Sequence, residues 1–138
     1  MKYFPFLLAL AALFSACDSK EDLKKKQYYV EGMELYKTHC ANCHQNDGKG
    51  LVGLYPPLAG SDFMLKNKEL VICAIRNGLS DTIVVNGKTY HQPMPPNSQL
   101  LALDIAEIST YIYKQWGNKE EITETKEVEK ILEKCKKK

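Results

Sequence analysis

Hydrophobic residues dominate the start of the chain and then return in shorter, regularly spaced groups. The first group, residues 3–14, is almost unbroken, follows the basic Lys2 and precedes the small residues Ser15 and Ala16. This order is typical of a secretory signal peptide over residues 1–16. A transmembrane helix needs about 20 apolar residues, so the run is too short to span a bilayer. The pattern predicts an exported protein.

Two later segments have the hydrophobic pattern of core helices. Residues 69–77 are largely apolar and end at Gly78, a residue that commonly terminates helices. Residues 103–116 keep one apolar face, and Ser98 is a candidate cap for the start of this helix. The face consists of Ile105, Ile108, Tyr111, Ile112 and Trp116. Both segments are predicted to pack in the interior.

Between these helices, residues 82–90 predict a short β-hairpin. Asn86 and Gly87 at its centre form the strongest two-residue turn signal. A proline-rich loop follows, in which Met94 stands directly between two prolines. Because proline fixes φ and restricts the preceding residue, this loop is predicted to be stiff and extended.

The end of the chain, residues 119–138, is highly charged and lacks aromatic residues. Its apolar residues recur at the spacing of one helical face: Val128, Ile131, Leu132 and Cys135. The stripe is narrow, and isolated helices of this length are weak without packing partners. We expect a marginal charged helix or a disordered tail, with docking on a partner protein as the alternative.

Length and charge narrow the class of protein. The 138 residues, 44% hydrophobic and 26% charged, fit one compact domain, assigned to residues 28–118, with appendages at both ends. The formal net charge of +2 argues against nucleic acid as a partner. Lysine runs at residues 24–26 and 136–138 are interpreted as solvated surface.

Cys17 follows the predicted signal peptide directly. Together with the residues before it, Cys17 resembles the lipobox of bacterial lipoproteins, in which cleavage precedes a cysteine that becomes lipidated. Acyl chains there would anchor the protein, since each buried methylene contributes about 0.8 kcal/mol. Residues 17–27 would then comprise the lipidated cysteine and a hydrophilic tether. The alternative is a plain cleaved signal with an incidental cysteine.

The remaining cysteines do not suggest a disulfide framework, because the total of five is odd and the spacing is uneven. Cys73 lies in the apolar segment 69–77 and is interpreted as a small buried hydrophobic residue. The sequence leaves open whether Cys135 forms an intermolecular bond.

Cys40 and Cys43, with His44 immediately after them, carry the candidate chemistry. This spacing is the signature of covalent haem attachment, in which the two sulfurs bind the haem vinyl groups and the imidazole binds the iron. A zinc site would need a second ligand pair, and a thioredoxin-like site would need strand–helix–strand patterning around the motif. The sequence has neither, so the motif predicts haem c.

Iron bound by His44 needs a ligand on its other face, and low-spin electron carriers use Met or a second His. The candidates are Met33, Met64, Met94, His39 and His91. The two nearest the motif, Met33 and His39, precede it in the same predicted helix and point along that helix. A stiff proline loop suits a weak thioether ligand, which favours Met94. His91 remains the alternative.

Taken together, these residues resemble a class I cytochrome c over residues 28–118. The resemblance is carried by Gly32 and Tyr36 before the motif, by residues 56–60 after it, by Met94 in its proline loop, and by the closing helix with Tyr111. It implies an all-α fold of three to four main helices around one haem, with the hairpin before the ligand loop. Gly32 would let the first helix approach Tyr111 on the last.

The resemblance also implies roles for residues around the haem. The carbonyl of Pro56 would accept a hydrogen bond from Nδ1 of His44, which fixes the orientation of a ligating imidazole. Leu58 would pack on the haem face. Tyr90 would either donate to a haem propionate or be buried at the haem edge.

These observations predict a monohaem electron carrier on the periplasmic side of a bacterial membrane. Iron held by His44 and Met94 has no position open to substrate, so we expect one-electron transfer and no small-molecule substrate. The expected partners are redox proteins such as a terminal oxidase or a dehydrogenase. The alternatives are a subunit bound permanently to a larger oxidoreductase through the tail, and a haem enzyme or sensor in which Met94 detaches.

Overall fold

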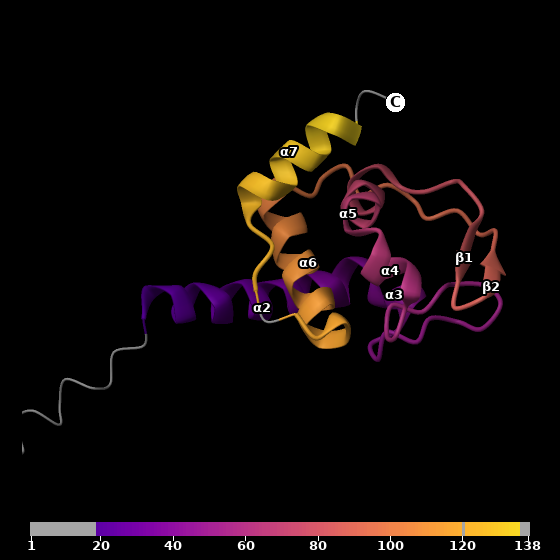
Figure 1. The fold of residues 1–138 in the computed structure, drawn as a ribbon, viewed down its shortest axis with the longest axis horizontal. Coiled ribbons are helices and arrows are strands. Elements are labelled where there is room, and N and C mark those ends of the chain that lie inside the picture. Colours follow the sequence, from indigo (N-terminus) through magenta and orange to yellow (C-terminus); the bar gives the residue numbers. More distant parts are fainter. Residues whose placement is uncertain (1–18, 120, 136–138) are drawn as a thin grey trace, which may run out of the picture.

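The computed structural model describes residues 19–119 and 121–135. Its elements are the helices α2 (Lys20–His39), α3 (Ala41–His44), α4 (Asp62–Lys66), α5 (Lys68–Asn77), α6 (Ala102–Gly117) and α7 (Thr125–Cys135), and the strands β1 (Ile83–Val85) and β2 (Lys88–Tyr90). The all-α fold with one short hairpin is as expected (Figure 1). The predicted signal peptide and Cys17 lie outside the described residues. Within the described ranges, no helix is both long and apolar enough to cross a membrane.

Helix α2 begins earlier than the sequence suggested. The side chain of Ser19 accepts a hydrogen bond from the backbone N–H of Asp22, which satisfies a free donor of the first turn. The segment assigned to a tether, residues 17–27, is therefore helical from its fourth residue and continuous with the domain. An ion pair of 2.7 Å between Lys24 and Glu124 also ties this part of α2 to the segment before α7.

Helices α2 and α6 cross in close contact at Gly32. A Cβ atom placed on Gly32 would lie 2.0 Å from the carbonyl oxygen of Glu107 and 3.0 Å from Cβ of Tyr111. Beside the crossing, the rings of Tyr36, Tyr111 and Trp116 pack with centroids 5.3–5.7 Å apart. The predicted approach of the first helix to Tyr111 is confirmed, and it joins the two ends of the domain.

Replacing Gly32 with Ala should lower the free energy of unfolding by about 3 kcal/mol, because the backbone of α6 must shift to admit the methyl group. Helix propensity alone would predict a gain of about 1 kcal/mol. Gly117→Ala, also in a helix, is the matched control, since its Cβ would meet only side-chain atoms at 3.3 Å or more. Chemical denaturation measures both variants, and an equal response at the two positions would contradict the close crossing.

Glu107 lies buried at this crossing, with 7% of its surface exposed. Burial and the negative charges of Glu31 and Asp104 raise the pKa of Glu107 to about 7. Because the folded chain favours the protonated carboxyl, ionising Glu107 opposes folding. The free energy of unfolding therefore falls as the pH rises from about 4.5 to about 7.

Relative to wild type, Glu107→Gln should be equally stable near pH 4 and more stable above pH 7, by on the order of 1–2 kcal/mol. Unfolding free energies measured across this range test the expectation. Glu31→Gln removes one of the two negative charges that act on Glu107, so it should recover part of this gain above pH 7. A constant difference between wild type and Glu107→Gln would show that the carboxyl titrates normally.

Helix α6 begins at Ala102, and its cap differs from the one expected. The carboxylate of Asp104 accepts a hydrogen bond of 2.7 Å from the backbone N–H of Leu101. The prediction that Ser98 caps this helix is wrong, because the chain turns into α6 three residues after Ser98. The apolar face of α6 is buried as predicted.

The hairpin forms around Asn86 and Gly87, as predicted. Strands β1 and β2 pair antiparallel with Val85 opposite Lys88, and both turn residues have positive φ angles, 51° and 76°. The turn is held to α4 by two hydrogen bonds: Asp62 N–H donates to the side chain of Asn86, and Asn86 N–H donates to the carboxylate of Asp62. The hairpin is thereby fixed beside α4.

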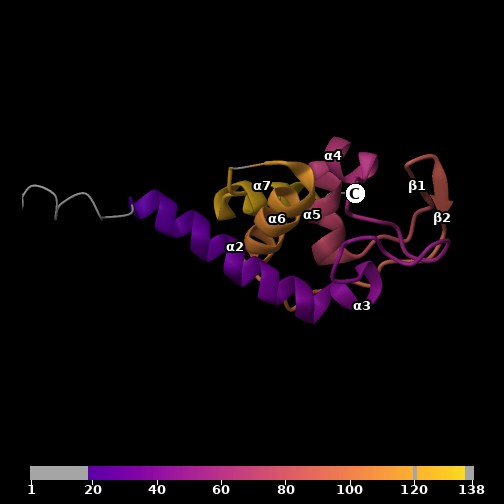
Figure 2. The same ribbon diagram turned by 90° about the horizontal axis from the view of Figure 1, so that it is seen from below.

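Helix α7 packs on α5 and α6 (Figures 1 and 2). Val128 and Ile131 are 0% and 5% exposed. The hydroxyl of Thr110 on α6 accepts a hydrogen bond of 3.0 Å from the backbone N–H of Thr123, which fixes the approach to α7. The expected helix is present, but it is packed and not marginal, because the apolar stripe is covered by the chain's own domain.

Cys73 and Cys135 form a disulfide that joins α5 to α7, with Cα atoms 5.9 Å apart. This corrects the expectation that Cys73 is simply a small buried hydrophobic residue. It also answers the question left open for Cys135, which bonds within the chain. A sequence separation of 62 residues gave no local signal for the pair. The two cysteines meet because α5 and α7 lie side by side.

Candidate functional site

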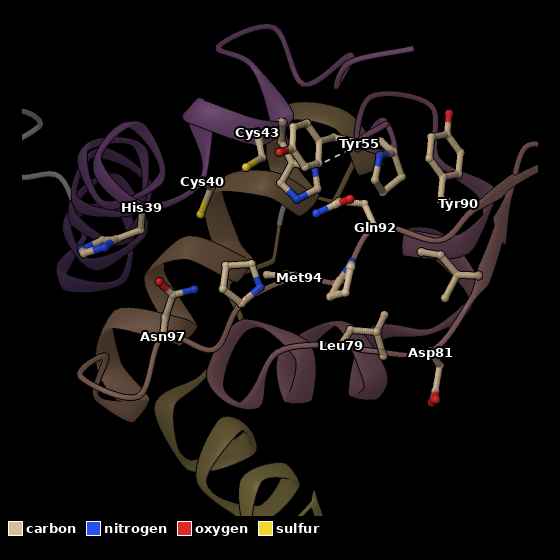
Figure 3. Close-up of a pocket in the computed structure, with 15 residues that line it drawn as sticks. His39, Cys40, Cys43, Tyr55, Leu79, Asp81, Tyr90, Gln92, Met94 and Asn97 are labelled. Carbon is tan, nitrogen blue, oxygen red and sulfur yellow. Dashed lines mark hydrogen bonds between the residues drawn. The ribbon is translucent and has the colours of Figure 1, made fainter. Parts of the chain in front are cut away.

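The attachment motif occupies the junction between α2 and α3. Cys40 ends α2 with its N–H donating to the carbonyl of Tyr36, and the N–H of His44 donates to the carbonyl of Cys40. This single turn places both thiols and the imidazole on one side of the chain. Cys40 and Cys43 are not disulfide-bonded and are partly buried, with their sulfur atoms directed toward a cavity (Figure 3).

Burial shifts the pKa values of two groups in this turn. It raises the pKa of the Cys40 thiol to about 12, and it lowers the pKa of His44. Reactive redox cysteines have lowered pKa values, so this environment argues against the thioredoxin-like alternative. A neutral imidazole is the form that binds a metal.

The imidazole of His44 is oriented by Pro56. Its Nδ1 lies 3.0 Å from the carbonyl oxygen of Pro56. This is the contact that the resemblance implied. Because a carbonyl can only accept, Nδ1 carries the proton and donates, which leaves Nε2 as the nitrogen available to a metal.

A compact loop holds the carbonyl of Pro56 in place. The N–H of Gly50 donates to the carbonyl of His44, and the N–H of Leu58 donates to the carbonyl of Gly48. Gly50 has a φ of +66°, and a Cβ added to it would lie 2.4 Å from the carbonyl oxygen of Tyr55 and 2.6 Å from that of Pro56. The role of Gly50 could not be foreseen from spacing, because it depends on how the loop closes.

Gly50→Ala should displace the Pro56 carbonyl from His44. Gly53→Ala is a close control, since Gly53 also has a positive φ, +80°, but faces open space. Left-handed backbone alone costs an alanine about 1–2 kcal/mol, so Gly50→Ala should lose about 2 kcal/mol more than the control. It should also shift the midpoint potential, measured by redox titration, while Gly53→Ala should not. Equal losses in the two variants would remove this role from Gly50.

Met94 lies across the cavity from Cys40 and Cys43 (Figure 3). It pairs with Leu79 through two backbone hydrogen bonds, of 2.8 Å and 3.0 Å. Leu79 comes directly after Gly78, the residue at which α5 ends. The pairing anchors the proline loop at the ligand candidate itself, which the sequence did not reveal.

The other candidate ligands are placed differently. Nδ1 of the exposed His91 lies 3.0 Å from the hydroxyl oxygen of Thr82, and His91 lines neither cavity near the motif. Met33 is partly buried, packs against the core cluster and also lines neither cavity. His39 lines one cavity, and Met64 lines the other.

Two adjoining cavities meet at the motif, and we call the part that they share the slot. Its residues line both cavities: Cys40, His44, Pro56, Leu79, Ile83 and Met94. The first cavity has about 730 Å³ of space free of atoms, part of it open to solvent. Of the candidates for an axial ligand, Met94 alone lines both cavities together with His44.

The two cavities differ in polarity. Leu58, Ile75 and Ile112 are among the mainly apolar residues that line the second, whereas His39, Asp81 and Asn97 bring polar groups to the first. Tyr90, 5% exposed, is part of the wall of the first cavity. A largely apolar macrocycle with polar groups on one edge fits this division. Cys40, His44 and Met94 stand at the junction, and Cys43 lines the first cavity beside them.

Comparison with known proteins gives consistent matches. The family described as Cytochrome c matches residues 29–116. A protein named cytochrome c-552 from Thermus thermophilus is 33% identical over 97 residues, which cover 67% of this chain and 73% of that protein. The cytochrome c subunit of a quinone alcohol dehydrogenase from Gluconacetobacter polyoxogenes is 35% identical over 92 residues, covering 65% of this chain. A fructose dehydrogenase cytochrome subunit from Gluconobacter japonicus is 34% identical over 94 residues, covering 64%. The matched part is 19% of each dehydrogenase subunit.

Proposed function

Because the chain belongs to the cytochrome c family, we propose that it carries single electrons between redox proteins through a haem iron held by His44 and Met94. Its cofactor is haem c, the covalently attached group of this family. We assign the thioether bonds to Cys40 and Cys43. When bound, the haem supplies a one-electron couple whose potential depends on the axial ligands, hydrogen bonds and burial.

The observation that carries the proposal is the shared lining of the slot by His44 and Met94. Each is held by backbone contacts: His44 by the Pro56 carbonyl, and Met94 by its pairing with Leu79. With both axial positions taken, substrate has no place on the iron. A methionine ligand raises the potential, which suits donation to a strong acceptor such as a terminal oxidase.

The proposed donor is a dehydrogenase, since two of the similar proteins are named as cytochrome subunits of dehydrogenases. Exposed apolar residues stand on the loop next to Tyr55 and Pro56 at the first cavity: Leu51, Val52 and Leu54, with 49%, 80% and 40% of their surfaces exposed. We propose that redox partners dock there briefly, through a small interface.

Lipidation at Cys17, on the periplasmic side of a bacterial membrane, completes the proposal. The alternative of a permanent subunit depended on the tail as a docking element. The buried Val128 and Ile131 no longer offer that surface, so the observation that motivated this alternative is gone. Nothing in the described residues favours a haem enzyme over a carrier.

Redox titration of the purified protein, followed by absorption, tests the function. We expect a single reversible one-electron transition and only slow, slight binding of carbon monoxide to the reduced protein at neutral pH. Electron transfer from a reduced dehydrogenase cytochrome subunit should be rapid. Stoichiometric carbon monoxide binding by the wild-type protein would contradict the closed site and favour a haem enzyme or sensor.

A further inference from the structure

Helix α5 connects the disulfide on one of its faces to the ligand loop at its end. Val71, Ala74 and Ile75 line the second cavity, and Cys73, between them in sequence, bonds Cys135 on α7. Helix α5 therefore lies between α7 and the haem site. Any shift of α5 would change both its packing on α7 and the lining of the second cavity.

Three contacts connect the C-terminal end of α5 to the loop that holds Met94. Leu79 exchanges two backbone hydrogen bonds with Met94. The side chain of Asn97 donates to the carbonyl of Ile75 at 3.3 Å. Gly78 packs so closely that an added Cβ would lie 2.6 Å from the carbonyl oxygen of Met94. The ligand loop thus moves with the last turn of α5.

The opposite face of α5 is fixed to α7 along its length. Ion pairs join Lys68 to Glu127 at 2.8 Å and Glu69 to Lys134 at 3.6 Å. Exposed ion pairs of this kind contribute little each, so the covalent bond at Cys73 is the dominant constraint. Helix α7 is itself seated on α6 by its buried apolar residues.

We propose that Cys73 and Cys135 are positioning residues for electron transfer, because their disulfide holds α5 so that Met94 stays on the iron. This inference rests on the proposed ligation by Met94. Breaking the bond needs two electrons and two protons, which a dithiol donates as it becomes a disulfide itself. Loss of the bond frees α5 from α7 and raises the fraction of molecules in which Met94 is detached.

Carbon monoxide binding to the reduced protein measures that fraction, because the gas reaches the iron only when Met94 leaves. Cys73→Ser/Cys135→Ser should bind carbon monoxide at least fivefold faster than wild type. Treating reduced wild type with dithiothreitol should give the same increase and leave the double variant unchanged. Asn97→Ala, which keeps the disulfide but removes one tie from the loop to α5, should also bind faster than wild type.

The control for general loss of stability is wild type in denaturant, at a concentration that lowers its unfolding free energy to that of the double variant. If this control binds carbon monoxide as fast as the double variant, the disulfide stabilises the fold and does not position Met94. Unchanged binding in Asn97→Ala would also overturn the link through α5. If the double variant fails to fold, the dithiothreitol and Asn97→Ala measurements decide whether the disulfide positions Met94 through α5. Wild type that binds as fast as Met94→Ala would overturn the proposed ligation itself, which is a distinguishable result.

Discussion

Replacing both Cys40 and Cys43 with alanine should abolish covalent haem attachment. The two thiols are the free cysteines of the described chain, and both line the first cavity. Intact-mass measurement of the purified protein should show a haem-sized addition in wild type and none in this variant. Cys73→Ser/Cys135→Ser removes the same number of cysteines away from the motif and should keep the addition. A haem-sized mass on the variant lacking Cys40 and Cys43 would contradict the assignment.

The same variant should also lose much of its fold. Large apolar side chains such as Met64, Ile108 and Ile112 line the second cavity, and without haem the apolar contacts on that side would be missing. Emptying the space beside a core side chain costs about 2–5 kcal/mol when a neighbouring core residue is truncated. Several such losses approach the total stability of a small domain, about 5–15 kcal/mol. Circular dichroism should therefore show reduced helix content and no cooperative unfolding.

Met94→Ala should open one face of the iron. The sulfur ligand is lost, nearly every reduced molecule should bind carbon monoxide, and the midpoint potential should fall because methionine ligation raises it. Absorption spectroscopy and redox titration measure these effects. Met64→Leu and His91→Ala are the matched controls, since these residues were the other candidates, and both should behave like wild type. If His91→Ala gave the open site instead, the ligand would be His91.

Local patterns predicted the elements whose signals lie within a few residues. Asn86 and Gly87 adopt positive φ angles at the tip of the hairpin, as this dipeptide commonly does in tight turns. The apolar face of residues 103–116 matched helix α6, and Gly78 ends α5. In each case the residues that determine the conformation are neighbours in sequence.

Features that depend on distant segments could not be predicted in this way. The stripe on residues 125–135 predicts a helical face but not which part of the chain covers that face, so the sequence alone predicts an isolated and therefore weak helix. The disulfide between Cys73 and Cys135 follows only from the packing of α7 on α5. The charged residues at the start of α2 are typical of a tether, whereas the structure has a helix there. Ser19 caps this helix, and Glu124, a hundred residues away in sequence, pairs with Lys24 on it.

In the candidate site, too, the residues set by local sequence could be predicted, and the contacts between distant segments could not. The attachment motif is contiguous, so Cys40, Cys43 and His44 were identified from spacing. Met94 was favoured for its stiff loop, but what holds that loop is backbone pairing with Leu79, fifteen residues earlier. The role of Gly50 likewise depends on the closed loop around Pro56.

The absorption spectrum of the oxidised mature protein tests the central claim most directly. Iron held by His44 and Met94 should show a weak sulfur-to-iron charge-transfer band at the red end of the visible range, and Met94→Ala should lack it. An oxidised wild-type protein without this band, whose reduced form binds carbon monoxide readily, would contradict the account of a closed, methionine-ligated electron carrier.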